Sequence, residues 1–181
     1  MRRQLQHGAA LLLATLMAGC GVGQAVKEST VEAAKWAFTT QVKTMNIDLV
    51  SRSSLNPNGG GRSLSTVVRF YQLRNAQAFD QLSYEQLQAT DLELLKPDLL
   101  AVKDVVLRPG AVASISEPMK DDTEYVGIVA LFREAGKDAT WKLAIPKKQW
   151  KKTDPVKIEV RDNMLELGGS ESIKRTAPQQ S

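Results

Sequence analysis

The chain has 181 residues and a formal net charge of +4, with one cysteine and one histidine. A chain of this length suits one compact domain, or one domain with a small insertion. A single cysteine excludes an internal disulfide, and so small a net charge gives little indication of binding to nucleic acid.

The first 20 residues have the pattern of an export signal. Two arginines stand near the start, an apolar run of 11 residues ends at Ala18, and Gly19 precedes Cys20. The run is too short to span a membrane, which takes roughly 20 residues. Its end resembles the lipobox of bacterial lipoproteins, in which the cysteine is acylated and becomes the first residue. We therefore expect residues 1–19 to be a signal peptide and Cys20 to carry lipid. The alternative is an ordinary signal peptide with an incidental cysteine.

Processing at this site removes the chemistry on which many enzymes depend. The only histidine, His7, leaves with the signal, and the only thiol becomes a thioether. Ser-His-Asp and Cys-His catalysis are then excluded, as are zinc sites built from His and Cys. An exported domain without disulfides must rely on its hydrophobic core for stability.

Residues 20–41 are predicted to form a lipidated N-terminus, a tether and a short helix. Small and polar residues continue to about Ser29, and Ser29 with Glu32 resembles a capping box for a helix at about 30–38. Alternation then begins at Met45, Ile47 and Leu49, which is typical of a half-buried strand.

Residues 53–62 carry the strongest loop signal in the chain. Pro57 and three consecutive glycines cannot continue a strand, and ten residues exceed what a tight hairpin needs. A second strand is predicted at 66–73, with Val68, Phe70 and Gln72 on one face and the intervening residues on the other. The loop is either a flexible connector or a functional loop on a rigid scaffold.

The periodicity changes after Asn75, where apolar residues recur at spacings of three to five. This predicts one or two short helices in an insert at about 75–96, ended by Lys96-Pro97. Further strands are predicted at about 102–107, 112–116, 125–132, 141–145 and 156–160. The strand at 125–132 is nearly all apolar, so we expect it to be central and buried on both faces. Residues 168–181 are polar and predicted to be disordered.

These elements indicate a mainly β fold, a β-sandwich spanning residues 42–167 with one helical insertion after the second strand.

Two charged clusters stand out. Asp121, Asp122 and Glu124 lack the ligand arrangement of a calcium site, so a solvated turn is the better interpretation. Residues 147–152 place four lysines around Trp150, a pattern that binds single-stranded nucleic acid or anionic headgroups. Export argues against nucleic acid, which leaves a solvated loop, anionic lipid or a partner protein.

Several segments resemble one family when they are taken in order. Leu55-Asn56-Pro57-Asn58, Gly61-Arg62 and the strand at 68–73 are similar to the outer-membrane lipoprotein of type VI secretion systems, the TssJ (SciN/VasD) family. Phe79, Leu87, Pro109-Gly110, the run at 125–133 and Trp141 continue the likeness, which covers about 42–146 besides the lipobox.

The resemblance implies a transthyretin-like sandwich of two four-stranded sheets. It also implies docking of the loop between the first two strands onto the periplasmic C-terminal domain of TssM, with TssL in the same complex. The loop residues concerned are Ser54, Leu55, Asn56, Pro57, Asn58, Gly59, Gly60, Gly61 and Arg62. Gly21 follows the cysteine where aspartate would imply inner-membrane retention, so the resemblance suggests the outer membrane, with the domain facing the periplasm.

Three hypotheses follow. The first is a lipoprotein that anchors a secretion complex through Cys20 and outer-membrane lipid, without enzyme activity, cofactor or metal. The second is a periplasmic cell-wall enzyme using two carboxylates, although nothing in the sequence pairs two acids in a pocket. The third is a lipoprotein that carries a lipid-like apolar ligand inside the sandwich.

Overall fold

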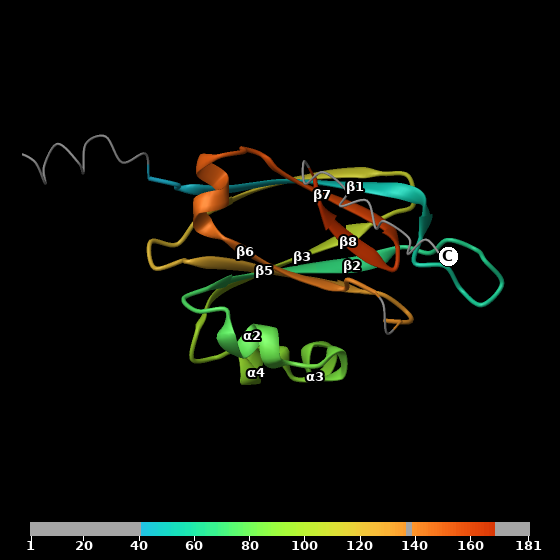
Figure 1. The fold of residues 1–181 in the computed structure, drawn as a ribbon, viewed down its shortest axis with the longest axis horizontal. Helices are drawn as coiled ribbons and strands as arrows, with labels where there is room; N and C mark the ends of the chain where they lie inside the picture. The colour runs from blue at the N-terminus through green and yellow to red at the C-terminus, as the bar shows by residue number, and fades with distance from the viewer. Residues whose placement is uncertain (1–40, 137–138, 169–181) are drawn as a thin grey trace, which may run out of the picture. The chain divides into compact units, whose positions relative to one another are not determined.

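Eight strands form two four-stranded sheets that pack face to face in the computed structural model, which describes residues 41–136 and 139–168 (Figure 1). The strand order is β4-β1-β7-β8 in the first sheet and β3-β2-β5-β6 in the second. The chain divides after Gln41 into two units, and both sheets belong to the unit that begins at Val42. The expected mainly β sandwich of two four-stranded sheets is confirmed.

The elements are listed here with their bounds. They are β1 (Thr44–Leu55), β2 (Thr66–Leu73), α2 (Gln77–Gln81), α3 (Tyr84–Ala89), α4 (Asp91–Leu94), β3 (Leu99–Leu107), β4 (Val112–Pro118), β5 (Tyr125–Leu131), β6 (Lys142–Pro146), the 3₁₀-helix η1 (Lys147–Lys151), β7 (Val156–Asp162) and β8 (Met164–Leu167). No helix within the described ranges is long and apolar enough to cross a membrane.

Some predicted features lie outside the described residues: the signal peptide, Cys20, the helix at about 30–38 and the tail after Gly168. Gly168 itself was expected in the disordered tail, but it ends the last strand in an ordered turn. Its N–H donates a hydrogen bond to the Lys157 carbonyl at 2.7 Å.

The first sheet differs from the sequence prediction at two places. β1 continues to Leu55, so Ser53 and Ser54 belong to the strand and not to the loop. The reason is that β7 runs parallel to β1 and still pairs with it at Leu55, beyond a bulge. The short strand β8 was not predicted, and it pairs with β7 through the two-residue turn after Arg161.

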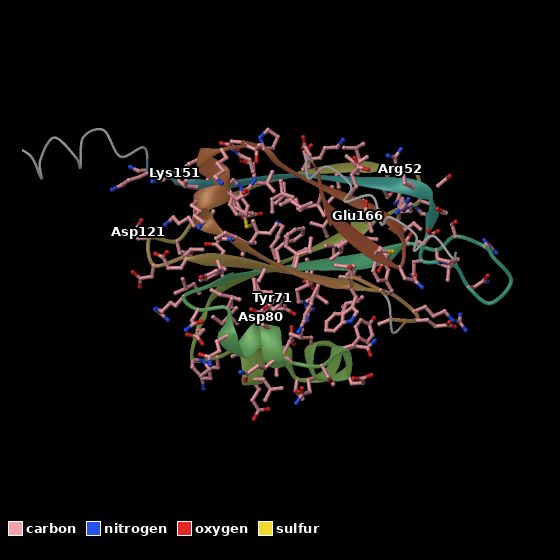
Figure 2. All side chains as sticks on the ribbon, viewed as in Figure 1. Arg52, Tyr71, Asp80, Asp121, Lys151 and Glu166 are labelled. Carbon is pink, nitrogen blue, oxygen red and sulfur yellow. The ribbon has the colours of Figure 1, made fainter. Side chains whose placement is uncertain are left out.

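The space between the sheets is filled by side chains from alternate strand positions (Figure 2). Ile47 and Leu49 enter it from β1, and Val68 and Phe70 enter it from β2, each at most 1% exposed. Burial of such side chains stabilises the fold by about 1.5–3 kcal/mol each. The alternation at both strands therefore matches the prediction.

The outer face of the second sheet is covered by the three short helices (Figure 1). Tyr71, Phe79 and Leu87 form a second apolar cluster there with Val129 of β5. Since β5 also contributes Ile128 to the sandwich core, it is buried on both faces, as predicted. The insert contains three helical turns where one or two were expected.

A network of ion pairs and hydrogen bonds attaches the insert to this sheet. Asp91 of α4 accepts hydrogen bonds from Tyr71 at 2.6 Å and from Arg69 at 2.8 Å. Arg69 also pairs with Asp104 of β3 at 2.7 Å. On the other side, the Lys142 ammonium donates to three carbonyls at the end of α2, those of Phe79, Asp80 and Leu82. The insert is therefore held at both its beginning and its end.

Candidate partner-docking site

The candidate docking loop, residues 56–65, connects β1 to β2 and projects from one end of the sandwich (Figure 1). The predicted docking residues divide into three groups by their exposure. Leu55 and Asn56 are buried, at 0% and 5% exposed. Pro57 and Asn58 are half-buried, and Ser54 and residues 59–62 are exposed. Leu55 belongs to the sandwich core, so it supports the loop and is not available to a partner.

Asn56 fixes the base of the loop. Its backbone has a φ of 47°, the left-handed region that asparagine tolerates better than most residues. Its side-chain amide donates to the Ser65 carbonyl at 3.1 Å, and its side-chain oxygen accepts from the Arg133 N–H at 2.7 Å. Its own N–H reaches the Asp162 carbonyl at 2.7 Å. Asn56 therefore ties the loop to two other connections, β5–β6 and β7–β8.

Asn58 closes the tip of the loop. Its side-chain oxygen accepts hydrogen bonds from the N–H groups of Gly60 and Arg62, at 3.1 and 2.9 Å. Its backbone N–H and carbonyl bond to Arg62 and Gly61, at 2.9 and 2.8 Å. Gly61 has a φ of 76°, which glycine adopts without steric cost. Residues 58–62 thus form a closed, hydrogen-bonded turn.

The same end of the sandwich carries three further connections. One is the β7–β8 turn at residues 162–163, and we include the other two with residues 56–65 in the term loop end. These are residues 108–111 between β3 and β4, and residues 132–136 after β5. The first is held to β1 because the Ser51 hydroxyl donates to the Arg108 carbonyl at 2.6 Å and Gly110 N–H donates to the Arg52 carbonyl at 3.1 Å. The second is held by Asn56.

The side chains of the loop end give it a net positive charge, because its three arginines outnumber the exposed Glu134. The exposed Asp162 lies beside it, in the β7–β8 turn. Arg62, Arg108 and Arg133 are exposed, and none forms an ion pair with any residue in the described ranges. By contrast, Arg52 pairs with Glu159 and Arg161 pairs with Glu166, each at 3.0 Å. Arg108 and Arg133 were not among the predicted site residues, because only the strand pairing brings them beside the loop.

The acidic cluster does not form a metal site, and the tryptophan of the lysine cluster is buried. Asp121 and Asp122 are exposed in the turn between β4 and β5, and Asp122 lies 3.5 Å from Arg74. Within the described ranges, no three His, Cys, Asp or Glu side chains are close enough to hold a metal ion. Trp150 of η1 is 4% exposed and donates to the Asn46 carbonyl at 2.9 Å, so it cannot stack on a base or enter headgroups.

The comparisons with known proteins identify the family and agree with the fold. Residues 43–163 match the model of the family described as type VI secretion lipoprotein, VasD, EvfM, TssJ. A chain of a structure described as a type VI membrane complex is 36% identical, with a TM-score of 0.66, over 70% of this chain and 98% of its own. A chain of a structure described as the type VI secretion protein TssM C-terminal domain from EAEC is 33% identical, with a TM-score of 0.61, over 70% and 98%.

A third solved structure, the TssJ1 lipoprotein of type VI secretion from Pseudomonas aeruginosa, has the same fold. Its TM-score is 0.61 at 23% identity, over 70% of this chain and 95% of its own. No curated protein sequence matches this one. Since the family match extends over well over half of the sequence, this chain belongs to the type VI secretion lipoprotein family of VasD, EvfM and TssJ.

Proposed function

We propose that this chain is an outer-membrane-anchored lipoprotein of the type VI secretion membrane complex, in which it docks the periplasmic C-terminal region of TssM. Membership of the family supports this role, as does a 33% identical chain in a structure named for the TssM C-terminal domain. The observation that carries the proposal is the hydrogen-bonded turn at residues 58–62 on the loop end. We place TssL in the same complex and assign the chain a structural role without catalysis.

The turn suits docking because its conformation is set before a partner arrives. Four hydrogen bonds involving Asn58 close it, and Asn56 holds its base against two other connections. A loop that is already ordered loses less conformational entropy on binding, and this raises its affinity for a partner. The exposed residues 59–62 are left to make the contacts.

The anchor is the acylated Cys20, followed by Gly21, which favours sorting to the outer membrane. One acyl chain binds a membrane only marginally, whereas two or more hold a protein stably, at about 0.8 kcal/mol per buried methylene. Confinement to one membrane surface also raises the effective concentration of neighbouring sites, so contacts of modest affinity can still build an assembly.

Capture of a purified TssM C-terminal fragment tests the docking. Asn58→Ala removes the side-chain oxygen that closes the turn, and we expect the affinity to fall about tenfold, or about 1.4 kcal/mol. Deletion of residues 58–61 should abolish capture. Asp121→Ala is the matched control, because it changes an exposed turn at the opposite end. Equal affinity of all variants, with unchanged circular dichroism, would remove the loop from the proposal.

Membrane fractionation tests the anchor. Cys20→Ser should move the protein from the outer-membrane fraction to the soluble or inner-membrane fraction, and type VI secretion should stop. Normal secretion by this variant would show that anchoring is not the function of the chain.

A further inference from the structure

The end of the sandwich opposite the loop end carries a cluster of lysines, which we define as Lys147, Lys148, Lys151 and Lys152. The first three of these lysines belong to η1 and Lys152 follows it directly. η1 lies beside the beginning of β1, where Lys151 is labelled in Figure 2. This is where the chain enters the sandwich at Val42, after the segment that begins at Cys20. The lysine cluster therefore lies at the end of the sandwich where the chain enters, 22 residues after Cys20.

The inner face of η1 fixes the orientation of the lysines. Trp150 is buried, and its indole N–H donates to the Asn46 carbonyl at 2.9 Å. Lys147 is half-buried, and its ammonium donates to the Asp121 carbonyl at 3.0 Å. A 3₁₀-helix repeats every three residues, so Lys147 and Trp150 share this inner face. Lys148 and Lys151 share a different face, which is exposed.

The outer lysines have no partner within the described part of the chain. Lys148, Lys151 and Lys152 are exposed and form no ion pair or side-chain hydrogen bond there. By contrast, Lys103 pairs with Glu117 at 2.6 Å and Lys157 pairs with Glu159 at 3.1 Å. Acidic residues do occur nearby. Asp122 is paired with Arg74, Asp154 accepts a hydrogen bond from Asn46, and Asp121 and Glu124 are exposed in the neighbouring turn.

We propose that Lys148, Lys151 and Lys152 contact anionic phospholipid headgroups of the leaflet that holds the lipid anchor, and so set the orientation of the sandwich on the membrane. This inference rests on the proposed anchor at Cys20, because the tether confines the cluster near the leaflet. A headgroup phosphate complements a lysine ammonium, and each such lysine near an anionic surface favours contact about fivefold. Exposed lysines contribute this attraction without first breaking an internal ion pair.

The geometry gives this contact a consequence for docking. Trp150 of η1 is hydrogen-bonded at Asn46, and the docking loop begins ten residues later at Asn56, at the other end of the same strand. At about 3.3 Å per residue, the loop lies roughly 33 Å farther along the strand. When the lysine cluster faces the membrane, the loop end therefore faces away from it, toward a partner in the periplasm.

Amine labelling of the lipidated full-length protein tests the proposal. The protein is incorporated into nanodiscs of neutral phosphatidylcholine, or of phosphatidylcholine with about one-third phosphatidylglycerol, and acetylation rates are read site by site by mass spectrometry. We expect Lys148, Lys151 and Lys152 to react at least about fivefold more slowly with phosphatidylglycerol present, corresponding to one lysine–headgroup contact. At about 1 M salt, where the Debye length is only about 3 Å, the rates should return to those in neutral lipid. Lys103 and Lys157 are internal references, and their rates should not change.

The outcomes are separable. Protein that does not co-purify with either nanodisc would refute the anchor, and this inference with it. Protein that co-purifies but labels equally in both lipids would refute the lysine contact alone. Slower labelling that appears only after a TssM fragment is added would assign the cluster to a protein partner and would also overturn the proposal.

Discussion

Two asparagines, Asn56 and Asn58, determine the shape of the docking loop in different ways. Asn56 is buried and uses its side chain to join the loop base to Ser65 and Arg133. Asn58 is half-buried and closes the turn at the tip. A buried amide without partners is costly, whereas one at the surface can exchange its bonds for water. Asn56 therefore supports the fold and Asn58 supports the proposed binding surface.

Replacing Asn56 should destabilise the whole domain. Asn56→Ala leaves the Arg133 N–H and the Ser65 carbonyl without their partner and keeps an unfavourable φ of 47°. We expect the free energy of unfolding to fall by about 1–3 kcal/mol, measured by urea denaturation. Asn56→Gly separates the two causes, because glycine accepts this φ but also lacks the amide. If the glycine variant is as stable as the wild type, the side-chain bonds contribute little.

At the scale of elements, the helical insert depends on the face of β2 and β5 that it covers. Its helices have only four to six residues each, too short to be stable alone. Two contacts with the sheet supply the missing stability. Phe79 and Leu87 pack on Tyr71, and Asp91 forms its hydrogen-bond network with the same sheet. The capping box at Ser83, which is satisfied by Gln86, adds a local contribution at the start of α3.

The Asp91 network predicts an acid-sensitive contribution to stability. Burial alone would raise the pKa of Asp91, but hydrogen bonds from Tyr71 and Arg69 outweigh it and lower the pKa below its ordinary value. A carboxylate with a lowered folded-state pKa contributes fully above its unfolded pKa of about 3.9, and the contribution disappears as pH falls through the folded value. Asp91→Ala should reduce the free energy of unfolding at pH 7 by about 2–3 kcal/mol.

The measurement is chemical denaturation between pH 7 and pH 2. The wild type should lose stability more steeply than Asp91→Ala below about pH 4, so the difference between the two narrows in acid. Tyr71→Phe, which removes one hydrogen bond and keeps the ring, should cost less than Asp91→Ala. If the free energy of unfolding of the wild type and of Asp91→Ala fell equally with pH, the Asp91 network would not be the source of the acid sensitivity.

Gly127 of β5 provides the space in which Phe79 packs. A Cβ atom at this position would lie 2.8 Å from the Phe79 ring, closer than atoms can approach. Gly127→Ala should therefore displace the ring and α2, and lower the free energy of unfolding by about 1–3 kcal/mol. The loss should be measured by thermal unfolding. Phe79→Leu in the same chain should recover part of it, because a smaller side chain relieves the overlap.

The sequence predicts some elements better than others, for physical reasons. β2 was predicted at its observed bounds because its side chains alternate between two faces that are both covered. β8 was missed because it has four residues, although Asp162-Asn163 between Val160 and Leu165 has turn chemistry that could have indicated a hairpin. η1 was expected to be a loop, since local pattern does not reveal that Trp150 is buried against Asn46.

The proposed docking site was also predicted only in part from the sequence. Pro57 and the three glycines identify the loop, and the resemblance assigns it a role. Which residues are exposed depends on contacts distant in sequence, such as that between Asn56 and Arg133, 77 positions apart. For that reason Leu55 and Asn56 were included as contact residues and Arg108 was omitted.

At the scale of the whole molecule, unpaired positive side chains gather at both ends of the sandwich. The outer lysines lie where the chain enters it, and Arg62, Arg108 and Arg133 lie on the loop end. The strand β1 runs between the two ends over twelve residues, about 40 Å. Charges separated by this distance act independently, because the Debye length is only about 8 Å at physiological ionic strength. The two ends can therefore be tested separately.

A charge reversal at Arg108 tests whether the docking surface extends beyond the loop. Arg108 makes no ion pair with the described residues, and only its backbone carbonyl is used, by the Ser51 hydroxyl and the Ala111 N–H. Arg108→Glu should therefore leave stability within about 0.5 kcal/mol. If a TssM fragment presents acidic groups to this end, its association rate constant should fall several-fold, and less so at high salt. Stopped-flow association at several salt concentrations measures both effects. Arg74→Glu, at the opposite end, is the control and should leave association unchanged. An Arg108 variant that associates at the wild-type rate would confine docking to residues 56–65.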